Sequence, residues 1–223
     1  MIGYDGAENR MIVKLVYYGP ALSGKTTNLL QLHDILDAGN RGDLMVLDTK
    51  DDRTIFFDLL PFFLKAPGGL EIKVKVYTVP GQVRHDATRK AVLMRADGVA
   101  FIADAQVSES RNNYESFDNL EKNLAFCGMD IGSIPLVIQF NKKDLPGTLP
   151  DDEIKKTWGA TGIPVFTASA MQGWGVLETF RRLAGLAYEH LNRQFGLSEK
   201  EGLRKEDFVN ALAGKGDMKD STT

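Results

Sequence analysis

The sequence predicts an α/β protein in which a mostly parallel central sheet, with one antiparallel strand at its edge, lies between two layers of helices. Apolar runs alternate along the chain with longer stretches of helical spacing, a pattern typical of a parallel sheet covered on both faces. One further segment alternates strictly between apolar and polar residues, which indicates a half-exposed strand. Together these two patterns define the expected three layers.

The expected strands and helices follow one another regularly. Apolar runs predict buried strands at residues 11–18, 98–104, 135–140 and 164–168. Helical spacing predicts helices near residues 25–37, 112–126, 151–158 and 174–192.

The alternating segment covers residues 71–79. Its apolar residues Ile72, Val74 and Val76 fall on one face, and charged residues fall on the other. We expect it to pair antiparallel with the segment near 43–49, at or close to a sheet edge. A turn at Gly68–Gly69 would precede it.

Residues 1–192 are expected to form one domain, and residues 193–223 an extension with equal numbers of basic and acidic side chains. Ser198 and Glu201 match a capping box, which predicts that a helix begins there. An amphipathic helix ending near Gly214 is predicted by four apolar residues: Leu203, Phe208, Val209 and Leu212. Two roles stay open, a helix packed on the domain with a mobile end, or a helix that docks a partner.

The composition excludes several classes of protein. The 223 residues carry a net charge of −3, so nothing draws the chain as a whole to nucleic acid or to an anionic membrane. Its single cysteine, Cys127, cannot form an internal disulfide, which favours the cytoplasm. The sequence shows no signal peptide, no membrane-spanning run, and neither a prenylation cysteine nor a myristoylation glycine. The three histidines show no zinc-ligand spacing.

A phosphate-binding loop follows the first strand. Residues 19–26, GPALSGKT, match the pattern G-x-x-x-x-G-K-[ST] between a predicted strand and a predicted helix. Backbone N–H groups converge on an anion only where side chains leave room, which explains the glycines. The expected phosphate-binding residues are Gly19, Ala21, Leu22, Ser23, Gly24, Lys25, Thr26 and Thr27. Lys25 would reach the β- and γ-phosphates, the Thr26 hydroxyl would ligate Mg²⁺, and Thr27 would donate to the α-phosphate.

A second motif selects the base. Residues 141–144, NKKD, directly follow a buried strand, at the end where ligands bind in open α/β sheets. The Asp144 carboxylate can accept two N–H groups that guanine has and adenine lacks. Lys142 can cover the base, and Asn141 can tie loops together. Ser169 and Ala170 follow the next strand, and the Ala170 N–H is expected to recognise guanine O6.

These motifs resemble the Ras-like small GTPases and, among them, the bacterial cell-polarity and gliding-motility GTPases of the MglA group. Five runs between residue 16 and about residue 146 carry the closer match: VYYGPALSGKTTNL, TKDDRTIFFDLLP, YTVPGQVRHDATRK, DGVAFIADAQ and VIQFNKKDLP. The resemblance implies the three-layer P-loop NTPase fold of small G proteins over residues 1–192. It also implies Mg²⁺ as cofactor, with GTP as substrate and GDP as product.

The resemblance assigns further roles. Thr54 matches the first-switch threonine that contacts Mg²⁺ and the γ-phosphate, and the Gly81 N–H would also bind that phosphate. Gln82 matches the glutamine that orients the attacking water. Arg53 matches an arginine finger, which is worth about 10³–10⁵ in rate. The expected metal ligands are therefore Thr26 and Thr54.

Two positions depart from the common pattern. Thr78 stands where most Ras-like proteins carry an aspartate that holds Mg²⁺ through water, a change that the MglA group shares. Asp51, Asp52 and Asp58 are all candidates to replace that carboxylate. Ala21 stands where relatives carry glycine and would crowd Gln82, so we expect slow intrinsic hydrolysis.

The leading hypothesis is a GTP/GDP molecular switch that acts in bacterial polarity or motility. The resemblance implies a homodimeric roadblock-fold activating protein as a partner and recruitment to a cell pole. An alternative is an interaction protein that holds GTP or GDP without hydrolysing it. An ATP-dependent kinase or ATPase is disfavoured by the NKKD motif. The effectors stay open.

Overall fold

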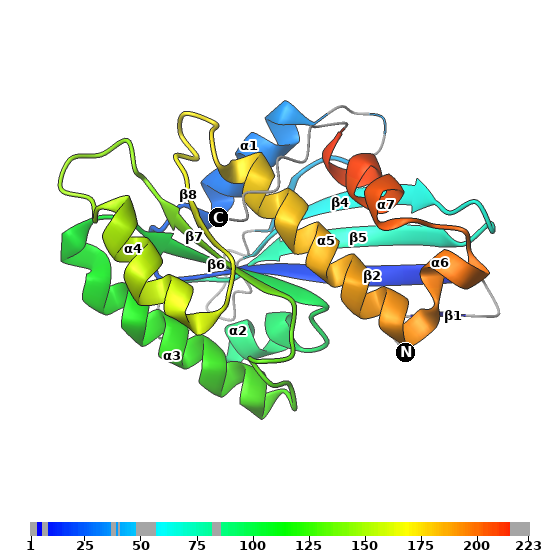
Figure 1. The fold of residues 1–223 in the computed structure, drawn as a ribbon, viewed down its shortest axis with the longest axis horizontal. Helices are drawn as coiled ribbons and strands as arrows, with labels where there is room; N and C mark the ends of the chain where they lie inside the picture. The colour runs from blue at the N-terminus through cyan, green and yellow to red at the C-terminus, as the bar shows by residue number, and fades with distance from the viewer. Residues whose placement is uncertain are drawn as a thin grey trace.

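The fold is that of a three-layer α/β protein. The computed structural model describes residues 4–5, 9–36, 39, 41–47, 57–81 and 86–214. One group of buried apolar residues packs the sheet against α1 (Lys25–Ile35), α5 (Val176–Phe195) and α7 (Lys205–Ala213). A second group packs the opposite face against α2 (Asp86–Leu93), α3 (Ser110–Phe126) and α4 (Asp151–Trp158). Figure 1 shows α5 crossing the sheet with α7 beside it. The predicted fold class is confirmed.

The described strands form one sheet in the order β3-β4-β5-β2-β6-β7-β8, with β1 paired to β2. Their bounds are β1 (Tyr4–Asp5), β2 (Arg10–Tyr18), β3 (Met45–Leu47), β4 (Phe57–Lys65), β5 (Glu71–Thr78), β6 (Gly98–Asp104), β7 (Leu136–Asn141) and β8 (Val165–Thr167). Parallel pairing joins β5, β2, β6, β7 and β8. β4 runs antiparallel to β5, and the short β3 pairs antiparallel with β4 at the sheet edge.

The predicted partner of residues 71–79 is wrong. β5 does show the expected alternation of burial, but it pairs with β4 (residues 57–65), and the segment near 43–49 contributes β3, one strand further out. Pro61 explains the error, because a proline inside an apolar run argues against a sheet strand. Here Pro61 needs no N–H for its pairing, and its carbonyl accepts a hydrogen bond from Gly42 N.

The predicted helix start at Ser198 is also wrong. Ser198 lies inside a short helix, α6 (Leu197–Lys200), and the chain then turns at Gly202, whose φ is 63°. α7 begins only at Lys205. Among the described residues, short 3₁₀ turns lie at Val107–Glu109 and Gly159–Thr161. The capping-box spacing failed because Gly202 interrupts the helix that it predicted.

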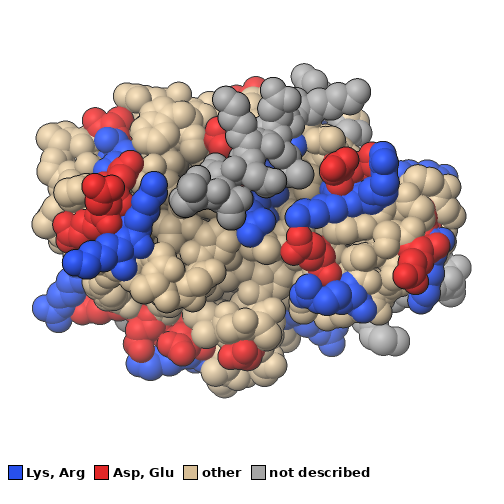
Figure 2. Space-filling view, viewed as in Figure 1, with Lys and Arg blue, Asp and Glu red and all other residues tan. Residues whose placement is uncertain are grey.

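Charges are mixed over the surface. In Figure 2, basic and acidic side chains intermingle over the visible described face, and neither sign forms a continuous patch there. Among the described helices, none combines the length and the apolar character needed to span a bilayer.

Candidate nucleotide-binding site

The phosphate loop has a backbone that only glycine allows at two points. Gly19 has φ 148°, and a Cβ there would lie 2.1 Å from the Ile102 carbonyl oxygen. Gly24 has φ 93°, and a Cβ there would lie 2.2 Å from Asn141 Nδ2. α1 begins directly after Gly24 with no acidic residue in its first turn and no side-chain cap at its start. Its first N–H groups are therefore oriented for an anion.

The middle of the phosphate loop lies against Gly81. A Cβ on Gly81 would lie 2.4 Å from the Ala21 backbone N and Cα, so Gly81 packs directly on the loop. Leu22 has φ 62° and is 87% exposed, whereas Ser23 is fully buried. The Ser23 hydroxyl has no hydrogen-bond partner among the described residues, so this buried polar atom has unused bonding capacity at the site.

Lys25 is buried, and its ammonium lies on the phosphate loop. Its Nζ donates to the carbonyl oxygens of Gly19 at 3.0 Å and Pro20 at 2.6 Å. Burial lowers the pKa of Lys25 to about 7, and the nearby positive charge of Arg89 adds to this. The Asp58 carboxylate acts in the opposite direction. A phosphate group beside Lys25 would restore its charge.

A carboxylate reaches the start of α1 from β4. Thr26 Oγ1 donates to Asp58 Oδ2 at 2.5 Å, and Thr78 Oγ1 donates to the same oxygen at 3.0 Å. Asp58 N in turn donates to Thr78 Oγ1 at 2.9 Å, and both residues are buried. Three aspartates could replace the carboxylate that is missing at Thr78. Of these, Asp58 is the one that the described structure brings to Thr26. Asp51 and Asp52 lie outside the described residues.

The base-recognition loops are joined to the phosphate loop by one buried side chain. Asn141 Nδ2 donates to the Ser23 carbonyl at 2.8 Å, and Asn141 Oδ1 accepts the Ala170 N–H at 2.9 Å. Ser169 is buried and hydrogen-bonded within its own loop, where its N–H donates to the Trp174 carbonyl and its hydroxyl accepts from Gln172 N. The predicted bond from Ala170 N–H to guanine O6 stays a prediction.

Lys142 is positioned by a residue that the sequence reasoning missed. Lys142 has φ 66°, and its Nζ pairs with Asp104 Oδ2 at 2.6 Å. Asp104 is buried at the end of β6, where Asn113 of α3 bonds both its N–H and its carbonyl. β6 and β7 are adjacent parallel strands, and Asp104 pairs in register with Asn141. A polar residue at the end of a buried strand was the signal available in the sequence.

The structure describes some of the remaining predicted site residues and not others. Asp144 is exposed, and no described residue is hydrogen-bonded to its carboxylate, which is therefore accessible to a base. Thr27 lies in the first turn of α1. Arg53, Thr54 and Gln82 lie outside the described residues, so their roles stay predictions.

Comparison with known proteins identifies the family of the chain. No protein-family model matches the sequence. The chain is 44% identical over 180 residues to the mutual gliding-motility protein MglA of Myxococcus xanthus, a match that covers 81% of this chain and 92% of that protein. The chain therefore belongs to the MglA family of small GTPases.

Proposed function

We propose that this protein is a GTP/GDP switch that hydrolyses GTP slowly and acts in cell polarity or gliding motility. The observation that carries guanine-nucleotide binding is the position of Asn141. Its amide joins the phosphate loop at Ser23 to the base loop at Ala170, so one buried side chain fixes both halves of the site. Asp144 follows Asn141 by three residues, and its exposed carboxylate would bind guanine.

The residues beside the phosphate loop fit Mg²⁺. The Thr26 hydroxyl and the Asp58 carboxylate are adjacent oxygen donors, and oxygen donors are what Mg²⁺ prefers in proteins. Thr26, Thr54 and Asp58 would hold the ion, which neutralises phosphate charge when bound. Asp58 would thus supply the negative charge that Thr78 lacks, because a hydroxyl group is neutral.

The proposed reaction is in-line attack of water on the γ-phosphate, which yields GDP and phosphate. Gln82 would orient the water, the Gly81 N–H would bind the γ-phosphate, and Lys25 and Arg53 would offset the developing charge. The close packing of Gly81 on Ala21 supports slow intrinsic turnover, because it leaves little room beside the loop.

The family supplies the cellular context of the proposal. The name of this relative assigns it to gliding motility, and we extend this role to the present chain together with a cytoplasmic location and recruitment to a cell pole. A homodimeric roadblock-fold protein would accelerate hydrolysis. The partner assignment rests on the family resemblance in the sequence.

The first test is the identity of the bound nucleotide. Nucleotide extracted from the purified protein should be GTP or GDP, and ATP or ADP would exclude the guanine assignment. Asp144→Asn should weaken GTP binding by about tenfold or more and favour xanthosine triphosphate, because an amide can donate where the carboxylate only accepts. Asp152→Asn, an exposed change at the start of α4, is the matched control.

The second test separates a switch from a permanently loaded interaction protein. Phosphate release should be measured over hours with the purified protein, alone and with a roadblock-type partner. Slow release that the partner accelerates supports the switch. No release in either case would favour the non-hydrolysing alternative.

A further inference from the structure

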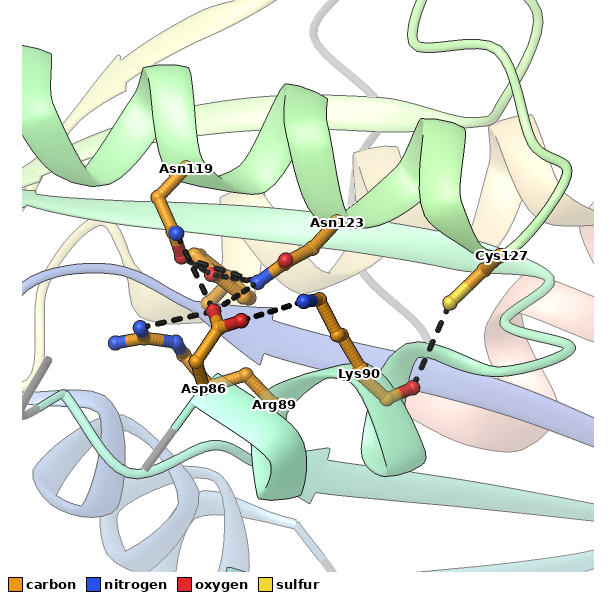
Figure 3. Close-up of polar contacts among 7 residues, drawn as sticks. Asp86, Arg89, Lys90, Asn119, Asn123 and Cys127 are labelled. Atoms are coloured by element: carbon orange, nitrogen blue, oxygen red, sulfur yellow. Dashed lines mark hydrogen bonds and ion pairs between the residues drawn. The ribbon is translucent and has the colours of Figure 1, made fainter. Parts of the chain in front are cut away.

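The start of α2 is fixed to α3 by one carboxylate. Asp86 Oδ1 accepts hydrogen bonds from Asn123 Nδ2 at 3.0 Å, Arg89 Nη2 at 3.2 Å and Asn119 Nδ2 at 3.3 Å. Asp86 Oδ2 pairs with Lys90 Nζ at 2.7 Å. Figure 3 shows these donors converging on Asp86 from α2 itself and from α3. The carboxylate thus has four donors, two of them on a different helix.

The same network reaches the strand that leads into the phosphate loop. The Tyr18 hydroxyl donates to Asn119 Oδ1 and accepts from Asn123 Nδ2 at 3.1 Å. Burial raises the pKa of Tyr18 to about 12, so the hydroxyl keeps its proton at physiological pH. Tyr18 is the last residue of β2 and directly precedes Gly19. The phosphate loop and α2 are therefore connected through two asparagines of α3.

The far end of α2 is attached to α3 as well. Cys127 Sγ donates to the Lys90 carbonyl at 3.6 Å, and Lys90 Nζ lies 4.6 Å from the centre of the Phe126 ring. α2 has only eight residues, and these contacts attach its first and last turns to α3 and to Cys127 directly after it.

The network is buried at the end that holds Tyr18 and Asn123. Tyr18 is fully buried and Asn123 is 1% exposed, so each would lose a hydrogen bond without regaining water if the network broke. The Asp86 side chain is 36% exposed, so its ion pair with Lys90 contributes less than these buried hydrogen bonds. Asn123 Nδ2 connects the buried end of the network to Asp86 at the start of α2.

Two described contacts relate this part of the chain to the phosphate loop. Gly81 packs directly on Ala21 of that loop. Asp86, five residues further along the chain, is connected to Tyr18 at the start of the loop through Asn119 and Asn123.

We propose that Asp86 and Asn123 are positioning residues for GTP hydrolysis, which set where α2 begins relative to the phosphate loop. The inference rests on the proposed function, because it assigns a role within that reaction. Neither residue would contact the nucleotide. They act through the position of α2 and through Tyr18, which directly precedes the phosphate loop, and a displacement of about 1 Å near a reacting group can cost up to about 100-fold in rate.

The test compares single-turnover hydrolysis with nucleotide release in the full-length protein. Asp86→Asn and Asn123→Ala should each slow hydrolysis about tenfold, while GTP and GDP release change less than about twofold. The double variant should be no slower than the slower single variant, because both changes break one network. Asp118→Asn, which removes an exposed carboxylate of α3 paired with Lys122, is the matched control and should leave both rates unchanged.

Tyr18→Phe is the milder variant, since it removes only a hydroxyl, and it replaces the other variants if they fail to fold. It should slow hydrolysis about threefold. Equal hydrolysis rates in wild type and in the folded variants would overturn the inference. Parallel losses in hydrolysis and nucleotide retention would also overturn it, because they indicate a merely structural role. A wild-type protein that does not hydrolyse GTP would instead refute the proposed function.

Discussion

The Thr26 hydroxyl donates a hydrogen bond to Asp58 Oδ2 at 2.5 Å, across 32 positions of sequence. The antiparallel pairing of β4 with β5 places Asp58 one step beyond the Leu59–Tyr77 pair and within reach of Thr78, and α1 packs against β4, which brings Thr26 to the same carboxylate. We propose that Asp58, on the neighbouring strand, supplies the carboxylate that most Ras-like proteins carry at the position of Thr78.

Asp58 is the first target for mutation. In Asp58→Asn, the slowing of nucleotide release by Mg²⁺ should be about tenfold smaller than in wild type, because the variant lacks the negative charge beside the Thr26 hydroxyl. Nucleotide release at varied free Mg²⁺ measures this effect. Asp43→Asn, an exposed change before β3, should behave like wild type.

A paired exchange tests the same idea more sharply. Thr78→Asp alone should destabilise the protein, since two buried carboxylates would adjoin. Asp58→Thr combined with Thr78→Asp should restore Mg²⁺ dependence, because the single charge returns to the neighbouring strand. If Asp58→Asn keeps the wild-type Mg²⁺ dependence, Asp58 does not serve the ion.

Asn141 is expected to support both folding and nucleotide retention. Asn141→Ala removes the bonds to the Ser23 carbonyl and the Ala170 N–H and leaves two buried groups unpaired. We expect a loss of about 2 kcal/mol in the free energy of unfolding and at least about tenfold faster nucleotide release. Denaturant unfolding and nucleotide-release kinetics measure the two effects. Asn112→Ala, at an exposed bond to Glu109, should change neither. Unchanged nucleotide release from Asn141→Ala would contradict the proposed function, which depends on the role of Asn141 in joining the two loops.

The sequence predicted those parts of the site that depend on short-range order. The phosphate loop and residues 141–144 each lie within one strand and the turn after it, so their motifs and neighbouring elements sufficed. Most predicted strands and helices came within two or three residues of the observed bounds, because apolar spacing reports burial directly.

The missed features depend on long-range pairing. The position of Asp58 beside Thr26 depends on the register of β4 on β5. Pro61 argued against a strand at β4, so this register could not be predicted. The pairing of Asp104 with Lys142 follows from the adjacency of β6 and β7, which no local pattern encodes. Strand order and register are global properties of the chain, and local sequence constrains them weakly.

The C-terminal helix should contribute to the stability of the domain. Phe208 of α7 is fully buried, and its ring centre lies 5.6 Å from that of Tyr188 in α5. Phe208→Ala should lower the free energy of unfolding by about 3–5 kcal/mol. Met171→Ala, at a residue that is 77% exposed, is the control and should cost less than about 0.5 kcal/mol in a denaturant titration. A small effect at Phe208 would show that α7 is dispensable for folding and would favour a docking role for the extension.

Asp97 should make stability depend on pH. Its Oδ2 accepts the Lys14 N–H at 2.7 Å, yet burial dominates and raises its pKa from 3.8 to about 6. Between about pH 4 and pH 6 the folded protein therefore holds a proton that the unfolded chain has released. The contribution of Asp97 to stability must then fall as the pH rises through this window and stay constant above it.

Asp97→Asn should remove that dependence. The amide oxygen can still accept the Lys14 N–H, but no charge has to be buried at neutral pH. The variant should match wild type near pH 4 and exceed it at pH 7 by up to about 3 kcal/mol, the free energy of a pKa shift of about two units. Denaturant unfolding at pH 4.5, 5.5 and 7, with Asp118→Asn as an exposed control, measures the difference. A constant difference across this range would contradict the argument, because only a group that titrates within the window can change the slope of stability against pH.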